Sequence, residues 1–136
     1  MVNSQGADGE KAIWGKPAEW VDYSGMFGDK RVDVAIFDSP TSFRHPTTWH
    51  ARAYGLFSAN PFGAREFTGD PMKDGSWTVP AGKSLRFRYR VMIHEGSITT
   101  EAIANLYRQY TATEKQRVLA GMRIVFLPSI TRAGDN

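Results

Sequence analysis

The strongest constraint on the fold is a run of strict two-residue alternation from Ser84 to His94. One set of alternate positions is apolar and the other is mostly basic. The apolar set is Leu85, Phe87, Tyr89, Val91 and Ile93, and the other set is Arg86, Arg88, Arg90, Met92 and His94. Successive side chains of a strand point to opposite faces of a sheet. The run therefore predicts a β-strand whose apolar face lies in the core, while its basic face is solvated or lines a polar surface.

Two further stretches favour extended chain. Lys30 to Asp38 alternates in the same way, and the turn residues Gly28 and Asp29 predict a hairpin with the preceding strand. Trp49 to Ala59 is expected to be extended, with a kink or bulge at Gly55. We therefore expect a mainly β fold.

The period changes near the C-terminus, where apolar residues recur at helical spacing. They are Ala102, Ile103, Leu106, Tyr107 and Tyr110. Thr99 is the expected N-cap of this helix, and Thr111 with Glu114 has the spacing of a capping box that would begin a second one. Gly121 would end the second helix, and residues 122–127 could form one more strand.

The predicted architecture is an antiparallel β-sandwich, supersandwich-like and incomplete, with one or two short helices near the C-terminus. We expect a disordered N-terminal tail over residues 1–11, a single β-rich domain over 12–127 that is partial, and a C-terminal tail over 128–136. The Gly-rich and polar character of the first ten residues is the basis for the N-terminal tail.

Composition narrows the classes of function. The chain has 136 residues and no cysteine, which excludes a disulfide framework, thiolate catalysis and cysteine-ligated metals. The net charge of +3 is mild and the basic residues do not form runs, so nucleic acid is not an expected partner. No apolar run approaches the roughly 20 residues that cross a bilayer, so no membrane partner is expected. No signal peptide is visible, and the sequence assigns neither a compartment nor a cofactor.

Residues 37–63 are the candidate site, because titratable, donor-rich and aromatic side chains gather there. If Trp49 to Asn60 is a strand, then His50, Arg52 and Tyr54 share one face, and small residues share the other. One interpretation is a pocket in which His50 is an acid/base or ligand and Arg52 holds an anionic or hydroxyl-rich group. The other interpretation, which spacing alone favours, is a solvent-facing edge whose small face packs on a neighbouring sheet.

The three histidines, His45, His50 and His94, could bind a metal only if the fold brought them together. They show no helical or strand pair spacing, and the nearby oxygen donors are Asp38 and Glu95. A hydrogen-bonded structural role is the commoner one for an isolated histidine, so no metal ligand is assigned. No nucleophile elbow, P-loop or dinucleotide fingerprint is present.

An ordered series of motifs resembles the bacterial family described as "methane oxygenase PmoA", a domain of unknown function. The motifs are Trp14-Gly, Trp20-Val-Asp-Tyr-Ser-Gly25, Ile36-Phe-Asp-Ser-Pro40, Arg44-His-Pro-Thr-Thr-Trp-His50, Tyr54-Gly-Leu-Phe57, Asn60-Pro-Phe-Gly63 and Leu85 to His94. The resemblance covers about Ile13 to Tyr110. Members of that family carry a further histidine-rich motif in an N-terminal half, so this chain resembles the C-terminal half only.

The resemblance implies a sandwich similar to the galactose-mutarotase-like folds, in which histidine, arginine and carboxylates on a concave sheet bind a saccharide and move protons. The matching positions are Arg44, His45, His50, Arg52, Asn60 and His94. With Tyr54 and Trp49 from the same stretch, the expected roles are proton transfer by His50, His45 and His94, and binding of a saccharide-like small molecule by Arg44, Arg52, Tyr54, Asn60 and Trp49.

Three hypotheses follow. The first is a carbohydrate-binding or carbohydrate-processing β-sandwich domain. The second is a metal-dependent oxygenase, which requires His45, His50 and His94 to converge on one ion. The third is a non-catalytic half domain that self-associates through open sheet edges.

Overall fold

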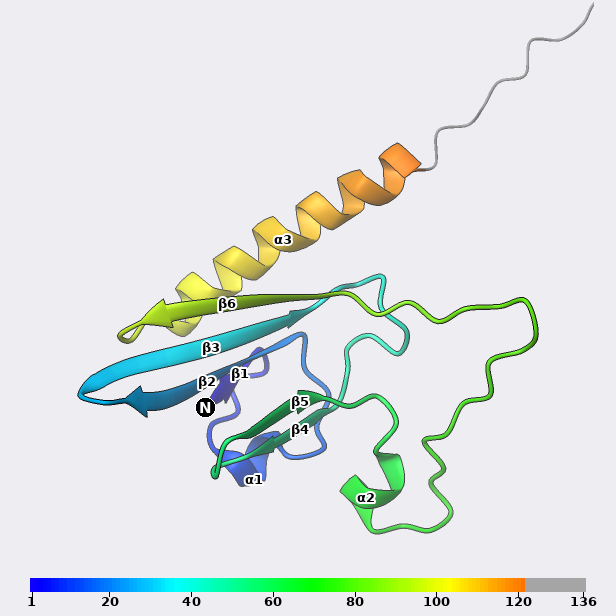
Figure 1. Ribbon diagram of the computed structural model, residues 1–136, viewed down its shortest axis with the longest axis horizontal. Helices are drawn as coiled ribbons and strands as arrows, with labels where there is room; N and C mark the ends of the chain where they lie inside the picture. The colour runs from blue at the N-terminus through cyan, green and yellow to red at the C-terminus, as the bar shows by residue number, and fades with distance from the viewer. Residues whose placement is uncertain (122–136) are drawn as a thin grey trace, which may run out of the picture.

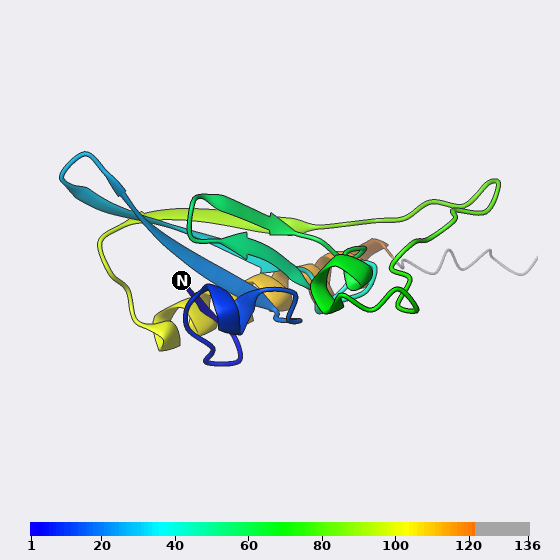
Figure 2. The ribbon, with the colours of Figure 1, turned by 90° about the horizontal axis from the view of Figure 1, so that it is seen from below.

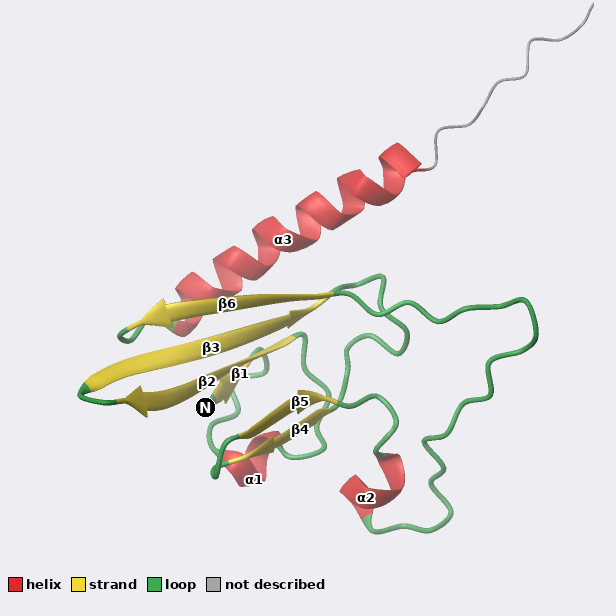
Figure 3. Ribbon diagram, in the orientation of Figure 1, coloured by secondary structure: helices red, strands yellow, loops and turns green. Residues whose placement is uncertain are grey.

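The computed structural model describes residues 1–121, which form two antiparallel sheets and three helices (Figures 1 and 3). In chain order the elements are β1 (Val2–Asn3), α1 (Glu10–Ile13), β2 (Trp20–Phe27), β3 (Lys30–Asp38), β4 (Trp49–Arg52), β5 (Leu56–Ala59), α2 (Ala64–Thr68), β6 (Tyr89–Glu95) and α3 (Thr100–Gly121). The larger sheet has the order β1-β2-β3-β6, and β4 pairs with β5 in the smaller one. The predicted mainly β, antiparallel architecture is confirmed, and it fits an incomplete β-sandwich.

The β2–β3 hairpin is the centre of the larger sheet. Its register pairs Trp20 with Phe37 and Phe27 with Lys30, so that the turn lies at Gly28 and Asp29 as the sequence predicts. Gly28 has a φ of 64°, which glycine adopts without the strain that a Cβ would cause. The strand predicted from Lys30 to Asp38 has those bounds.

One core lies between the larger sheet and α3, which runs alongside the sheet (Figures 1 and 2). From the sheet come Trp20, Ala35 and Phe37; from the helix come Ile103, Tyr107 and Tyr110. The Phe37 ring meets the Tyr107 ring edge-on at 5.7 Å between centroids, a favoured geometry for an aromatic pair. The helical face predicted from the 3.6-residue period is therefore the face that is buried.

A second core lies between the opposite face of β2 and β3 and the β4–β5 hairpin. It contains Ile13, Ala18, Val21, Trp49 and Ala51, with Ile36, Phe57 and Ala59 packed against it. Neighbouring residues of β2 and β3, such as Trp20 and Val21, face opposite sides of the sheet. The two strands therefore contribute side chains to both cores. The small face of β4 is packed on a neighbouring sheet, as the second interpretation of this strand predicts.

The faces of β6 are the reverse of the prediction. Met92 pairs with Ala35 and His94 with Asp33, which places both on the side covered by α3. Val91 and Ile93 are 59% and 70% exposed, although their period predicts burial. The reason is that alternation separates two faces but does not identify which one a distant helix covers.

The first part of the predicted strand is also not paired as a strand. β6 begins at Tyr89 rather than Ser84. Before it, the backbone follows the loop after β3, where the Ser39 N–H donates to the Arg88 carbonyl and the Phe43 N–H donates to the Arg86 carbonyl.

Two other predicted elements differ in extent. Trp49 to Ala59 is a hairpin of two four-residue strands rather than one kinked strand, because Gly55, with a φ of 105°, lies in a reversing turn. α3 is one continuous helix. Thr99 does cap it, since its hydroxyl accepts the Ala102 N–H, but Thr111 donates its hydroxyl to the Arg108 carbonyl and begins no second helix. Within the described residues, no helix is long and apolar enough to cross a membrane.

Residues 1–11 are ordered, which corrects the expected disordered tail. Val2 and Asn3 pair with Asp22 and Val21 of β2, and the Asn3 side chain, 1% exposed, accepts the N–H groups of Gln5 and Ala7. These hydrogen bonds compensate for the cost of burying the polar side chain of Asn3. The strand expected over residues 122–127 and the tail over 128–136 lie outside the described residues.

We expect Ile103→Ala to lower the free energy of unfolding by about 2–5 kcal/mol, because it opens a cavity where α3 meets the sheet. Leu119→Ala, on an exposed position of the same helix, should change it by less than about 0.5 kcal/mol. Chemical denaturation followed by circular dichroism measures both. Equal effects of the two substitutions would contradict the assigned helix face.

Candidate functional site

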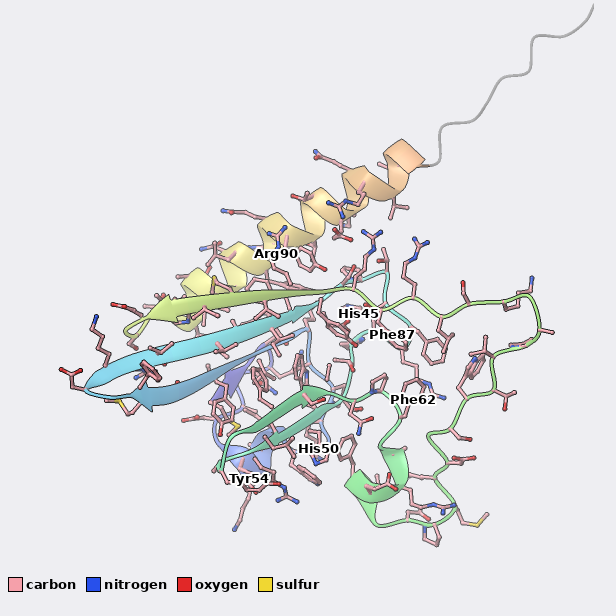
Figure 4. The ribbon with its side chains drawn as sticks, viewed as in Figure 1. His45, His50, Tyr54, Phe62, Phe87 and Arg90 are labelled. Atoms are coloured by element: carbon pink, nitrogen blue, oxygen red, sulfur yellow. The ribbon has the colours of Figure 1, made fainter. Side chains whose placement is uncertain are left out.

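The fold separates the three histidines into three environments. His45 is hydrogen-bonded to Asp38, His50 lies against the rings of Trp14 and Phe67, and His94 lies against Asp22. His45 and His50 are labelled in Figure 4 and come from different segments. The convergence on one ion that the oxygenase hypothesis requires is therefore not present among these residues.

The polar face of β4 is covered by α1 and its following turn. The Arg52 guanidinium lies 3.5 Å from the centre of the Trp14 ring and donates from Nη1 to Glu10 at 2.6 Å. The pKa of Glu10 is lowered, first by the Ala53 N–H that donates to it and then by Arg52. Arg52 is thus engaged in a structural contact, and His50 packs on the edge of the same Trp14 ring.

Tyr54, Asn60 and Trp49 also have structural positions. Tyr54 is 80% exposed in the turn of the β4–β5 hairpin (Figure 4). The Asn60 carboxamide accepts the Phe62 N–H and shapes the turn after β5. Trp49 is fully buried and donates its indole N–H to the Ala18 carbonyl at 2.9 Å.

Arg44 fastens the long connection between β5 and β6. Its guanidinium donates to the carbonyl oxygens of Pro61, Gly75 and Ser76 at 2.9, 2.6 and 3.2 Å. It also lies over aromatic rings, with centroid distances of 5.0 Å to Phe43, 5.6 Å to Phe62 and 5.9 Å to Trp77. We call this arrangement the Arg44 clamp. Three of the five hydrogen bonds that the guanidinium can donate are therefore made to the protein's own backbone.

A predicted site residue, His45, lines a pocket and is hydrogen-bonded to a buried carboxylate. Asp38, at the end of β3, is 0% exposed, and its Oδ2 accepts the Thr47 N–H and contacts His45 Nδ1, both at 2.9 Å. Its Oδ1 has no hydrogen-bond partner among residues 1–121. The His45 side chain is 18% exposed, so one end of the ring is held in the protein while part of it stays accessible.

The pocket beside His45 has a volume of about 550 Å³. It lies where the loop after β3 meets the start of β2 and α3, and its lining combines aromatic rings with hydrogen-bonding groups. The residues are Ser4, Glu19, Trp20, Pro40, His45, Ala104, Tyr107, Arg108, Thr111 and Lys115. Such a mixture suits a small polar ligand better than an apolar one.

Tyr107 lines this pocket and is also hydrogen-bonded to Asp38, the partner of His45. Its hydroxyl donates to the Asp38 backbone carbonyl at 3.2 Å. Burial raises the pKa of Tyr107 far above its ordinary value, and the negative charges of Glu19 and Asp38 raise it further. The hydroxyl therefore stays protonated and positions the end of β3 rather than exchanging protons.

The geometry suits His45 for proton transfer. A carboxylate can only accept a hydrogen bond, so the contact with Asp38 places the hydrogen of the neutral ring on Nδ1. Nε2 then carries the free lone pair and can act as a general base. The buried carboxylate also stabilises the imidazolium that forms when Nε2 accepts a proton.

Sequence reasoning missed the role of Asp38, Tyr107 and Glu19. Asp38 was noted only as a nearby oxygen donor, although its place at the end of an alternating strand, with His45 in the loop that follows, was a usable signal. Tyr107 was assigned to the core and gave no functional signal. Glu19 belongs to a segment whose position depends on the fold of β2.

A family model described as "Family of unknown function (DUF6807)" matches residues 1–108. The match covers every element from β1 to the first two turns of α3, and it includes Asp38, His45 and Tyr107. No curated protein and no solved structure matches the chain.

We expect Arg44→Gln to increase the rate of limited proteolysis within residues 64–83 several-fold, because three carbonyl oxygens lose a charged donor. Arg86→Gln is the matched control, since Arg86 is an exposed arginine shortly before β6. Mass spectrometry of the fragments identifies the cleavage sites. An unchanged cleavage rate in Arg44→Gln would contradict the structural role of the clamp.

Proposed function

The chain belongs to the family of unknown function DUF6807, and we propose that it is a saccharide-binding and saccharide-processing domain in which His45 transfers protons. The observation that carries this proposal is the contact between His45 Nδ1 and the fully buried Asp38 carboxylate at 2.9 Å. A buried carboxylate that orients a histidine at the edge of a polar pocket is a common arrangement for acid–base catalysis.

The lining of the pocket supports a hydroxyl-rich ligand. Ser4, Glu19, Arg108, Thr111 and Lys115 supply donors and acceptors around its wall, and Glu19 adds a second titratable group. The resemblance of the sequence to a family with galactose-mutarotase-like folds also favours a saccharide. With two titratable groups, one can take a proton from a hydroxyl while the other gives a proton to a second oxygen.

The proposed step begins with neutral His45, whose Nδ1–H is donated to Asp38. Nε2 accepts a proton from a sugar hydroxyl, and the resulting imidazolium is stabilised by the carboxylate at its other end. The proton is then donated to the ring oxygen as its bond to the anomeric carbon breaks, which gives the open-chain aldehyde and regenerates neutral His45. Ring closure on either face of the aldehyde, with the proton transfers reversed, exchanges the anomers. This assignment moves the centre of the site from His50, which is packed against Trp14, to His45.

We expect a saccharide from a panel of aldoses and uronates to bind the protein in calorimetric titrations and to show faster exchange between its anomers by NMR. His45→Gln should lower that exchange rate by about 10²–10⁴-fold, the usual contribution of a general acid or base, with little effect on affinity. Asp38→Asn should also lower the rate, because an amide can present the wrong hydrogen-bonding group to Nδ1.

His50→Gln is the control, since it removes a histidine outside the pocket. Its exchange rate and affinity should equal those of the unsubstituted chain. Loss of activity in His50→Gln with full activity in His45→Gln would contradict the proposal, as would the failure of every saccharide in the panel to bind.

A further inference from the structure

A second cluster of titratable groups lies on the helix-covered face of the larger sheet, away from the His45 pocket. Asp22 of β2, Asp33 of β3 and His94 of β6 each offer one atom, and these three atoms all lie within 4.8 Å of one another. Asp33 pairs directly with His94 in the sheet register. Three adjacent strands therefore hold the three side chains, which makes the arrangement rigid. Along β3, Asp33 is about 17 Å from Asp38 at the usual rise per residue.

The orientation of His94 is the first observation that indicates a cation. Its Nδ1 lies 3.1 Å from the Gly96 carbonyl oxygen, which can only accept, so Nδ1 carries a hydrogen. Its Nε2 lies 3.3 Å from Asp22 Oδ1. In the neutral ring, the Nε2 lone pair would face a carboxylate oxygen, which is repulsive unless a positive charge lies between them. Histidines that bind metals commonly donate their other ring N–H to a backbone carbonyl in this way.

The Nε2–Oδ1 separation is the second observation. A charge-assisted hydrogen bond between a nitrogen and a carboxylate oxygen is usually about 2.7–2.9 Å long. Two ligand atoms bound tetrahedrally at about 2.0–2.1 Å from a zinc ion are about 3.3 Å apart. The observed 3.3 Å between His94 Nε2 and Asp22 Oδ1 is compatible with two ligands of one zinc ion.

The burial and the charge of the two carboxylates also favour a bound cation. Asp22 is 4% exposed and Asp33 is 1% exposed, so two carboxylates are removed from water at adjacent positions. Arg31 donates to Asp33 through Nε and Nη2, and the Ser24 hydroxyl donates to Asp33 Oδ2 at 3.2 Å. One arginine balances one carboxylate and leaves one negative charge.

Asp22 is the member of the cluster that lines a pocket. Asp22 and Ser24 line a pocket of about 470 Å³, which also contains Asp8, Arg31 and Ser97. The contact between Asp22 and His94 uses Asp22 Oδ1. The pocket gives an ion a path to Asp22 and has room for a water molecule as an additional ligand.

We propose that Asp22, Asp33 and His94 bind a divalent metal ion of the zinc type. One imidazole nitrogen with two carboxylate oxygens suits zinc better than magnesium or calcium, which prefer oxygen ligands alone. A fourth position faces the pocket. This site does not depend on the proposed role of His45.

The test uses the metal ions themselves. The chain, freed of metal by a chelator, is titrated with Zn²⁺ by calorimetry, and we expect saturation at one ion per chain. Co²⁺ serves as a spectroscopic probe, and tetrahedral binding should produce visible absorption that Zn²⁺ abolishes. Asp22→Asn and His94→Gln should each weaken Zn²⁺ binding at least tenfold. His50→Gln and His45→Gln should leave the affinity unchanged.

An NMR measurement on the unsubstituted chain keeps the test valid if a variant fails to fold. Zn²⁺ should shift the His94 Nε2 resonance while Nδ1 keeps its hydrogen. Three results would overturn the proposal: no saturable binding of Zn²⁺, binding that Asp22→Asn and His94→Gln leave intact, or a His94 ring that carries hydrogens on both nitrogens at saturating Zn²⁺. The last result would show that an imidazolium supplies the missing charge.

Discussion

The rest of the structure depends on the way β3 supplies both of its faces to a core. Phe37 and Ala35 lie under α3, while Ile36 lies under the β4–β5 hairpin. Without β3 in the centre, neither the helix nor the hairpin would have a sheet to pack on. The two functional proposals also depend on this strand, since Asp38 at its end orients His45 and Asp33 in its middle lies between Asp22 and His94.

In two places a ring nitrogen of a histidine contacts a buried carboxylate, but the two contacts differ in their geometry. At His45, one carboxylate oxygen is 2.9 Å from Nδ1, and the ring edge reaches a pocket. At His94, a backbone carbonyl binds Nδ1, while two buried carboxylates surround the other end of the ring. In the proposed catalytic site, the first arrangement leaves the Nε2 lone pair of His45 to a ligand. In the proposed metal site, the second places Nε2 of His94 beside Asp22, while Arg31 balances the charge of Asp33.

The sequence predicts elements better than it predicts their surroundings. Strict alternation located β3 to the residue, and the helical period located the buried face of α3, because both signals are local. The exposed position of Val91 and Ile93 could not be predicted, since it depends on which side of β6 the later helix covers. The ordered N-terminus was missed for a similar reason: polar Asn3 is buried because its carboxamide accepts two backbone N–H groups.

The candidate site was predicted in part. The sequence predicts functional side chains in residues 37–63, and the structure brings His45 of that stretch into contact with Asp38. The remaining polar residues there, such as Arg44 and Arg52, have structural contacts that depend on segments distant in the sequence, including Glu10 and Ser76. Residue type and spacing cannot separate an arginine that binds a ligand from one that binds the protein's own carbonyl oxygens.

The Arg44 clamp also limits which sequences can maintain this fold. The carbonyl of Gly75 accepts from Arg44, and a Cβ added at position 75 would overlap the backbone carbonyl of Phe62. Alanine, the smallest other L-residue, is therefore already too large, and the overlap is with backbone, which cannot rotate away as a side chain can. Substitution of Gly75 should therefore not be tolerated as long as Arg44 is retained. The two positions are expected to change together or not at all.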